Sequence, residues 1–203
     1  MATSFIYWHP YIYQLATRVL YGGNHTARFR AVADLIPQGA TVLDCCCGPA
    51  QLYHRYLKPK GVTYTGLDVN PQFVARLTRG GERGEVRDLR DTRPLPQAEY
   101  VVMQASLYHF LPDADAVVLR MLQAASKHVI IAEPIRNLTS SNVALVRLLG
   151  RFLTDPGTGD QPHRFTERSL DQLLSRLGVR VVRSFLASGG REKVYVLAAP
   201  SRP

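Results

Sequence analysis

The sequence predicts an α/β protein with one domain over residues 1–203. Its core is expected to be a doubly wound, seven-stranded and mostly parallel sheet with helices on both faces. Three observations lead to this fold class. Five short apolar runs alternate with helical patterns, as in a parallel β-α sheet. Two further apolar runs near the C-terminus are separated only by a glycine-containing turn, which indicates an antiparallel hairpin. The length of 203 residues suffices for one full hydrophobic core.

Seven segments are expected to be strands, because their β-branched and apolar residues suit a sheet that is covered on both faces. In chain order they are Thr41–Asp44, Val62–Asp68, Glu85–Asp88, Tyr100–Gln104, His128–Glu133, Val179–Phe185 and Lys193–Leu197. Ser188–Arg191 is the predicted hairpin turn between the last two. A dehydrogenase-type Rossmann sheet would continue with a sixth parallel strand, so the hairpin separates two fold families that share their first half.

Helical patterns occupy the intervals between these strands. They cover Thr26–Leu35, Ala50–Leu57, Pro71–Thr78, Asp113–Ala125 and a last helix from Thr166 that Gly178 ends. Asn70 is the expected N-cap of the third helix, with Pro71 at its first position. A further apolar helix over Asn142–Leu153 would line an acceptor cavity, contact a second subunit of a homodimer, or pack in the core.

Composition narrows the function classes. The net charge is +9, but the basic residues are scattered, which favours a solvated arginine-rich surface over nucleic-acid binding. Cys45, Cys46 and Cys47 are adjacent, which is the spacing of neither a disulfide framework nor a zinc site, and no metal is expected. No apolar run is long enough for a membrane span, and the N-terminus lacks a secretory pattern, so a cytoplasmic location is predicted.

The segment after the first strand carries the first functional signal. In Asp44–Ala50 an acidic residue ends the strand and a tight loop of small residues leads into a helix. Ligands of open α/β sheets bind at this edge, where small residues let the backbone approach them. The segment resembles the first motif of class I S-adenosylmethionine-dependent methyltransferases, acidic-x-Gly-x-Gly-x-Gly. Gly48 is the middle glycine, while Cys46 and Ala50 fill the outer positions. The resemblance implies cofactor contacts at Asp44, Cys46 and Gly48; a purely structural turn is the alternative.

Two further strand ends agree with this resemblance. A carboxylate at Asp68, which ends the second strand, can accept both hydroxyls of an adenosine ribose, with Val69 beside it. Helix capping is the alternative, but Asn70 can take that role and leave Asp68 free. In the family, an acidic residue after the third strand accepts from the adenine amino group and the next amide reads the ring, which implies Asp88 and Leu89. Pairing of Asp88 with a neighbouring arginine is the alternative.

The fourth predicted strand leads into Gln104–Pro112, which resembles the motif beside the amino acid end of the cofactor. The resemblance implies Gln104, or the carbonyl next to it, as a partner of the cofactor's ammonium group. His109 is the leading candidate for a catalytic base, because imidazole titrates near neutral pH. Tyr108 could orient an acceptor. Packing under the loop is the alternative for both side chains.

Two flanking segments are expected to complete the site. Residues 1–25 are rich in aromatic residues and are a predicted lid, with Tyr13 as one cofactor contact. Docking of an N-terminal helix on the sheet is the alternative. Residues 137–165 are a predicted substrate-cap insertion. His163, in the Gly/Pro-rich part of this insertion, is a further candidate for acceptor contact, with helix capping as its alternative.

The resemblance implies S-adenosylmethionine as cofactor and S-adenosylhomocysteine as product. The predicted activity is methyl transfer to a small-molecule acceptor, with a hydroxyl of an aromatic or lipid-like compound favoured. RNA or protein methylation is an alternative, although no Asn/Asp-Pro-Pro-aromatic motif follows the fourth strand. A non-catalytic cofactor-binding scaffold is another, suggested by the two missing glycines but opposed by the retained carboxylates. The terminal hairpin disfavours a nicotinamide dehydrogenase.

Overall fold

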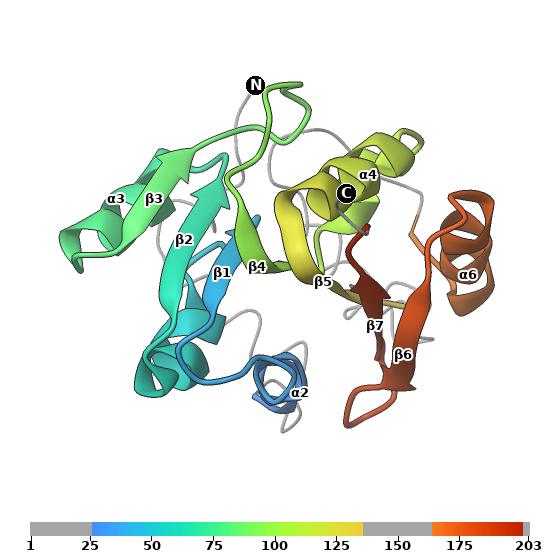
Figure 1. The fold of residues 1–203 in the computed structure, drawn as a ribbon, viewed down its shortest axis with the longest axis horizontal. Coiled ribbons are helices and arrows are strands. Elements are labelled where there is room, and N and C mark those ends of the chain that lie inside the picture. The colour runs from blue at the N-terminus through green and yellow to red at the C-terminus, as the bar shows by residue number, and fades with distance from the viewer. Residues whose placement is uncertain (1–25, 136–163, 201–203) are drawn as a thin grey trace, which may run out of the picture.

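The computed structural model describes residues 26–135 and 164–200, and these residues form a seven-stranded sheet (Figure 1). The strands are β1 (Thr41–Cys45), β2 (Thr63–Asp68), β3 (Arg83–Val86), β4 (Ala98–Gln104), β5 (Ala125–Pro134), β6 (Val181–Leu186) and β7 (Glu192–Ala198). Their order across the sheet is β3-β2-β1-β4-β5-β7-β6. Neighbouring strands among β1–β5 are parallel, and β7 pairs antiparallel with both β5 and β6. The predicted fold class, with its terminal hairpin, is confirmed.

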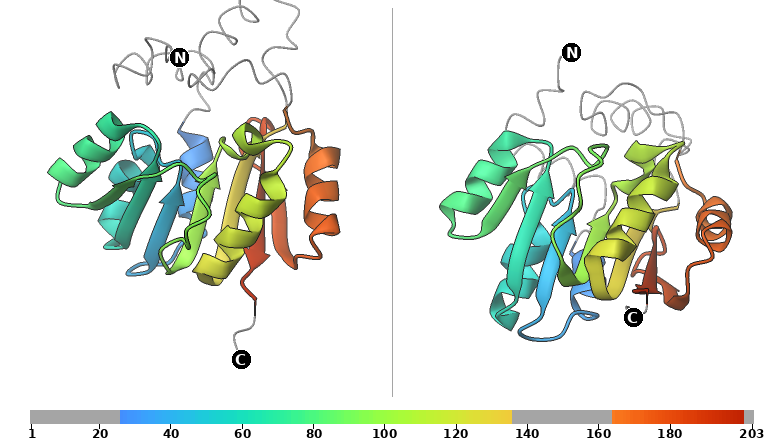
Figure 2. Two further views of the ribbon diagram at one scale, coloured as in Figure 1. Left: turned by 90° about the horizontal axis from the view of Figure 1, so that it is seen from above. Right: turned by 45° about the horizontal axis from the view of Figure 1, so that its top comes forward.

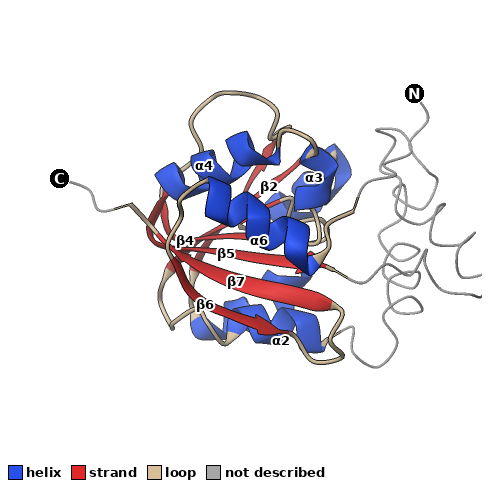
Figure 3. Ribbon diagram, turned by 90° about the vertical axis from the view of Figure 1, so that its right-hand side faces the viewer, coloured by secondary structure: helices blue, strands red, loops and turns tan. Residues whose placement is uncertain are grey.

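Helical elements flank the sheet on both sides (Figure 2). They are α2 (Ala27–Ala33), η3 (Tyr53–Leu57), η4 (Lys58–Lys60), α3 (Pro71–Arg79), η5 (Leu107–Phe110), α4 (Ala114–Ala124) and α6 (Glu167–Arg176). Figure 3 shows α4 and α6 on one side of the sheet and α2 on the other. Among the described residues, no helix is both long enough and apolar enough to cross a lipid bilayer.

The sheet separates two apolar layers, because successive residues of a strand point to opposite faces. Leu43 of β1 packs in the layer under α4 and α6, whereas its neighbour Val42 packs in the layer that also holds residues of α2, η3 and α3. Both side chains are fully buried. Because both faces of β1 are covered, the carboxyl ends of the parallel strands form the edge at which loops and polar side chains meet.

The structure differs from the sequence-based prediction at several element ends. β3 begins at Arg83 and ends at Val86, so Asp88 lies in the following loop and not in the strand. At Gly84 the strand packs closely against α3, because a Cβ there would meet Val74 and Leu77 at 3.1 and 3.3 Å. The predicted helix after β1 is regular only at its start and continues as the π-helical turn η3.

Three of the predicted segments fall wholly or mainly outside the described residues. They are the lid over residues 1–25, the apolar helix over Asn142–Leu153, and all but the end of the substrate cap over residues 137–165. The end of the cap is described: Phe165 is buried in the layer with α4 and α6, directly before α6 begins.

Candidate functional site

The loop after β1 has the backbone of a glycine-rich loop, although Gly48 is its one glycine at a motif position. Cys46, Gly48 and Ala50 have φ angles of 60°, 55° and 51°, in the left-handed region that favours glycine. These are the three positions where the sequence motif expects glycine. The two other side chains therefore strain the backbone by about 1–2 kcal/mol each. No atom of the described residues lies within 4 Å of the place that a Cβ on Gly48 would take.

Asp44 lies beneath this loop at the end of β1. It is 4% exposed and accepts a hydrogen bond from the hydroxyl of Tyr64 on β2 at 2.7 Å. Burial raises the pKa of Asp44 to about 7, against the lowering effect of that hydrogen bond. Asp44 therefore links β1 to β2 through Tyr64 and carries a carboxyl group that titrates near neutral pH.

Asp68 joins the loop to the end of β2. Its Oδ2 accepts from the N–H of Gly48 at 2.8 Å, and its Oδ1 accepts from the N–H of Asn70 at 2.8 Å. Asn70 caps α3 by accepting from the N–H of Gln72, as predicted. The expectation that this would leave Asp68 free is wrong, because its carboxylate accepts from the backbone amides of Gly48 and Asn70 and also has a backbone hydrogen bond with Val69. A carboxylate has about four acceptor sites, so a ligand hydroxyl can still donate to Asp68.

Two exposed valines stand beside Asp68 at the same edge of the sheet. Val69 follows Asp68 and is 57% exposed, and Val86, at the end of β3, is 50% exposed. Val86 is the register partner of Asp68. Val69 was a predicted contact, but Val86 was not. Its only signal in the sequence is its place at a strand end, which many buried valines share.

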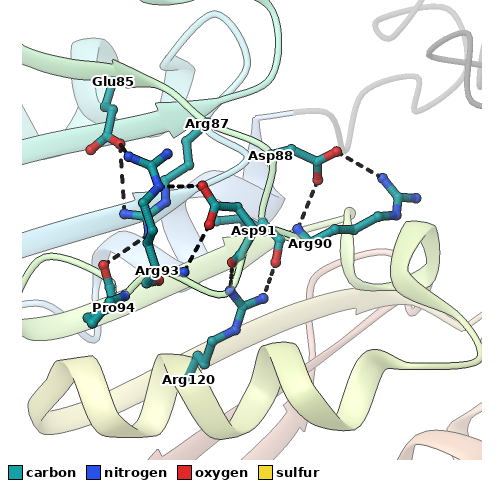
Figure 4. Close-up of polar contacts among 9 residues, drawn as sticks. Glu85, Arg87, Asp88, Arg90, Asp91, Arg93, Pro94 and Arg120 are labelled. Atoms are coloured by element: carbon teal, nitrogen blue, oxygen red, sulfur yellow. Dashed lines mark hydrogen bonds and ion pairs between the residues drawn. The ribbon is translucent and has the colours of Figure 1, made fainter.

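Arginines hold the loop that follows β3 (Figure 4). Buried Arg87 donates from Nη2 to the carbonyls of Arg93 and Pro94 at 2.5 and 3.0 Å. Arg120, on α4, donates to the backbone carbonyls of Leu89 and Asp91. Hydrogen bonds from both sides therefore fix the path of this loop. Leu89 itself is buried, at 2% exposure.

Asp88 lies on the exposed side of the same loop. Its Oδ1 accepts from the N–H of Arg90 at 2.9 Å, and its Oδ2 lies 3.5 Å from Nη1 of the same arginine. The alternative of an arginine partner is therefore realised. The side chain is still 46% exposed, so the carboxylate remains accessible to a ligand.

Glu133, at the end of β5, organises the loop after β4. It is fully buried and accepts from three consecutive backbone N–H groups, those of Ser106, Leu107 and Tyr108, at 3.2, 3.1 and 3.3 Å. Burial raises the pKa of Glu133 to about 8, and nearby Glu192 adds to the rise, while the hydrogen bonds oppose it. Sequence reasoning placed Glu133 only as a strand end, because its partners lie some 25 residues earlier in the chain.

Gln104 ends β4, where the chain turns out of the sheet. Its side-chain amide donates to the carbonyl of Arg28 on α2 at 3.4 Å, and its own carbonyl accepts from the hydroxyl of Ser106 at 3.0 Å. The next residue, Ala105, has a φ of 49°, and this left-handed step produces the sharp turn. Gln104 thus lies at the predicted place, and its carbonyl oxygen keeps a second lone pair.

Tyr108 and His109, both on η5, lie between Arg164 and Arg90. Their ring centroids are 4.0 Å apart. The guanidinium carbon of Arg164 lies 3.4 Å from the centre of the Tyr108 ring, and Arg90 donates to the carbonyl of His109 at 2.9 Å. Burial, followed by the charges of Arg164 and Arg90, lowers the pKa of His109 to about 3. The imidazole is therefore uncharged at neutral pH and is a weak base.

Two predicted site residues, Tyr13 and His163, lie outside the described residues. Over residues 26–135 and 164–200, no three or more His, Cys, Asp and Glu side chains gather closely enough to hold a metal ion. The three cysteines are free thiols, and burial raises the pKa of each, so they are not poised as nucleophiles.

The sheet order, the terminal hairpin and the left-handed loop after β1 together define a Rossmann-like fold of the class I methyltransferase type. The sequence pattern of a family described as "Methyltransferase domain" matches residues 8–184. The chain belongs to this methyltransferase family, as predicted.

Two curated relatives and one solved structure show how far the likeness extends. Trans-aconitate 2-methyltransferase of Mycobacterium tuberculosis is 29% identical over 149 residues, which are 71% of this chain and 54% of that protein. The chain thus spans about half the length of that relative. An uncharacterised methyltransferase of Synechocystis is 28% identical over 96% of this chain and 95% of its own length. Magnesium protoporphyrin IX methyltransferase of Synechocystis, solved with bound S-adenosylhomocysteine, has a TM-score of 0.64 at 15% identity and covers 91% of this chain and 93% of its own.

Proposed function

We propose that this protein transfers the methyl group of S-adenosylmethionine to an oxygen atom of a small-molecule acceptor. The observation that carries the proposal is the loop after β1. It keeps a left-handed backbone at all three motif positions, and open space lies beside Gly48, whose amide is bound to Asp68. Membership of the methyltransferase family supports the reaction class. Relatives named for trans-aconitate and magnesium protoporphyrin IX support a small-molecule acceptor.

The edge of the sheet fits the parts of this cofactor. Asp68 offers its remaining lone pairs to the ribose hydroxyls. Exposed Val69 and Val86 offer apolar contact to the adenine ring, and the accessible carboxylate of Asp88 can accept from its amino group. The carbonyl of Gln104 stands where the resemblance puts the ammonium group, and the Cys46 turn lets the backbone approach the ligand.

When bound, the cofactor supplies an electrophilic methyl group, so the protein's main task is to position the acceptor. The loop after β4 suits this task, because Glu133 holds three of its amides. A hydroxyl of an aromatic or lipid-like compound is the acceptor expected from the sequence, with His109 receiving the proton. The low pKa of His109 makes it a weak base for that proton transfer.

Calorimetric titration tests the proposal directly. Saturable binding of S-adenosylmethionine and S-adenosylhomocysteine, without binding of NAD, is the expected result. If neither S-adenosylmethionine nor S-adenosylhomocysteine binds the purified chain, the proposal is wrong. The absence of glycine at positions 46 and 50 would then indicate a non-catalytic scaffold that has lost cofactor binding.

A substitution at Gly48 separates cofactor contact from fold stability. Gly48→Ala should lower the free energy of unfolding by only about 1 kcal/mol, because the added methyl meets no atom of residues 26–135 and 164–200 and only strains the backbone. The same methyl enters the space assigned to the cofactor, so the dissociation constant for S-adenosylhomocysteine should rise about tenfold or more. Calorimetry and urea denaturation measure the two effects.

Gly39→Ala is the matched control for this experiment. Gly39 also has a positive φ, 72°, with no atom within 4 Å of an added Cβ, but it precedes β1 at the opposite edge of the sheet. It should lose similar stability and keep full cofactor affinity. Equal affinities of the Gly48→Ala and Gly39→Ala proteins would place the cofactor elsewhere.

A further inference from the structure

Arg164 lies against Tyr108. Its guanidinium carbon is over the ring, 3.4 Å from the ring centre, which is stacking distance. A stacked guanidinium keeps its N–H donors in its own plane, at its rim, where they match the two oxygens of a carboxylate. Within residues 26–135 and 164–200, those donors have neither a hydrogen-bond acceptor nor an ion-pair partner. Arg164 is half-buried, so an anion bound there would be partly shielded from water.

Arg90 adds a positive charge at the same place. It contacts the carbonyl of His109 and lies over the Phe110 ring at 5.4 Å. Two acids face this cluster. Asp88 is half-exposed and lies 3.5 Å from Arg90, so water weakens its pairing. Glu133 directs its oxygens at the backbone amides of the loop; burial favours its uncharged form, and the nearby charge of Arg164 opposes that effect without cancelling it. Positive charge therefore dominates around Tyr108 and His109.

His109 is a weak base. Its Nδ1 is buried and has no hydrogen-bond partner among the described residues, so no carboxylate orients or activates the ring. The two arginines beside it oppose its protonation. An acceptor that must lose a proton is poorly served by this arrangement, whereas an acceptor that is already an anion needs no base.

We propose that the methyl acceptor is a small-molecule carboxylate, bound by the guanidinium group of Arg164 and attracted by that of Arg90. This inference rests on the proposed function and narrows its acceptor from oxygen compounds in general to carboxylates. An oxygen lone pair of the carboxylate forms the new bond to the methyl carbon. The bond between that carbon and sulfur breaks, and its electron pair remains on the sulfur. No proton is released, and the product is a methyl ester.

Matched acceptor pairs test the inference. The full-length protein, saturated with S-adenosylhomocysteine, is titrated with succinate, citrate, benzoate and laurate. The partners without a carboxylate are 1,4-butanediol for succinate and citrate, benzyl alcohol for benzoate and 1-dodecanol for laurate. At least one carboxylate should bind saturably, and its alcohol should not. With methyl-labelled S-adenosylmethionine, the product should be an ester whose label is released by mild alkali.

Variants of two arginines assign the binding. Arg164→Gln should weaken binding of that carboxylate by about 10-fold or more and leave the affinity for S-adenosylhomocysteine unchanged, which also shows that the variant folds. Arg164→Lys, which keeps the charge but not the planar fork, should keep part of the affinity. Arg168→Gln, an exposed position on α6, is the matched loss of charge and should change neither value.

The outcomes separate this inference from the proposed function. Binding of S-adenosylhomocysteine with no binding of any of the four carboxylates, or an alkali-stable methyl ether as product, overturns the carboxylate inference alone. Unchanged carboxylate affinity in Arg164→Gln overturns the role of Arg164. Failure of the protein to bind S-adenosylhomocysteine overturns the proposed function and the inference with it.

Discussion

Replacement of Asp68 by alanine is expected to raise the dissociation constant for S-adenosylhomocysteine about 100-fold or more. Two hydrogen bonds from ribose hydroxyls to a carboxylate contribute about 3 kcal/mol together, and this corresponds to the predicted factor. The structure adds a second reason. Asp68 also accepts from the amides of Gly48 and Asn70, so its loss frees the loop that faces the cofactor. Calorimetric titration measures the change.

Two further variants sharpen this prediction. Asp68→Asn keeps one acceptor oxygen and should fall between the native protein and Asp68→Ala. Asp113→Ala removes the same charge at an exposed position before α4, where the side chain makes no capping hydrogen bond. It should bind the cofactor product as well as the native protein does. An Asp68→Ala protein that folds and keeps its affinity would exclude the ribose role.

Replacement of Glu133 by leucine should lower the free energy of unfolding by about 3–5 kcal/mol. The reason is that the N–H groups of Ser106, Leu107 and Tyr108 would lose their acceptor, and unsatisfied buried donors are costly. Glu133→Gln keeps one carbonyl oxygen and should lose distinctly less. Urea denaturation at pH 7 measures both. Equal losses for the two variants would mean that side-chain volume matters there and hydrogen bonding does not.

The ionisation of Glu133 predicts how stability depends on pH. Its folded-state pKa, about 8, lies above its ordinary value of 4.5, so between these values the folded protein binds the proton that the unfolded chain has released. The free energy of unfolding should therefore fall as the pH rises through this window and level off above it. Asp44, raised from 3.8 to about 7, acts in the same direction over the lower part of the window.

Denaturation curves between pH 5 and pH 9 check this prediction. The Glu133→Gln protein should show a shallower decline than the native protein, because its residue 133 cannot ionise. A decline of the same steepness in both proteins would show that other groups are responsible.

The order of the elements was predictable because it depends on local patterns. Runs of β-branched residues mark strands, and the glycine-containing Ser188–Arg191 turn marks the hairpin. In the structure this turn closes with a hydrogen bond from the Ala187 N–H to the Glu192 carbonyl at 2.9 Å. The places of Asp44, Asp68 and Gln104 followed from the same logic, since parallel strands bring their carboxyl ends to one edge. The exact ends of β3 did not, because they depend on how closely α3 packs.

The sequence by itself determined the fold class, the methyltransferase family and the edge of the sheet at which the candidate site lies. These depend on periodicity and on motif residues near one another in the chain. Only the tertiary structure decided that Asp68 braces the loop, that Glu133 holds the turn after β4, and that His109 stands between Arg90 and Arg164 as a weak base. The reason is physical: burial and the field of distant charges set hydrogen bonding and protonation, and those distances exist only once the chain has folded.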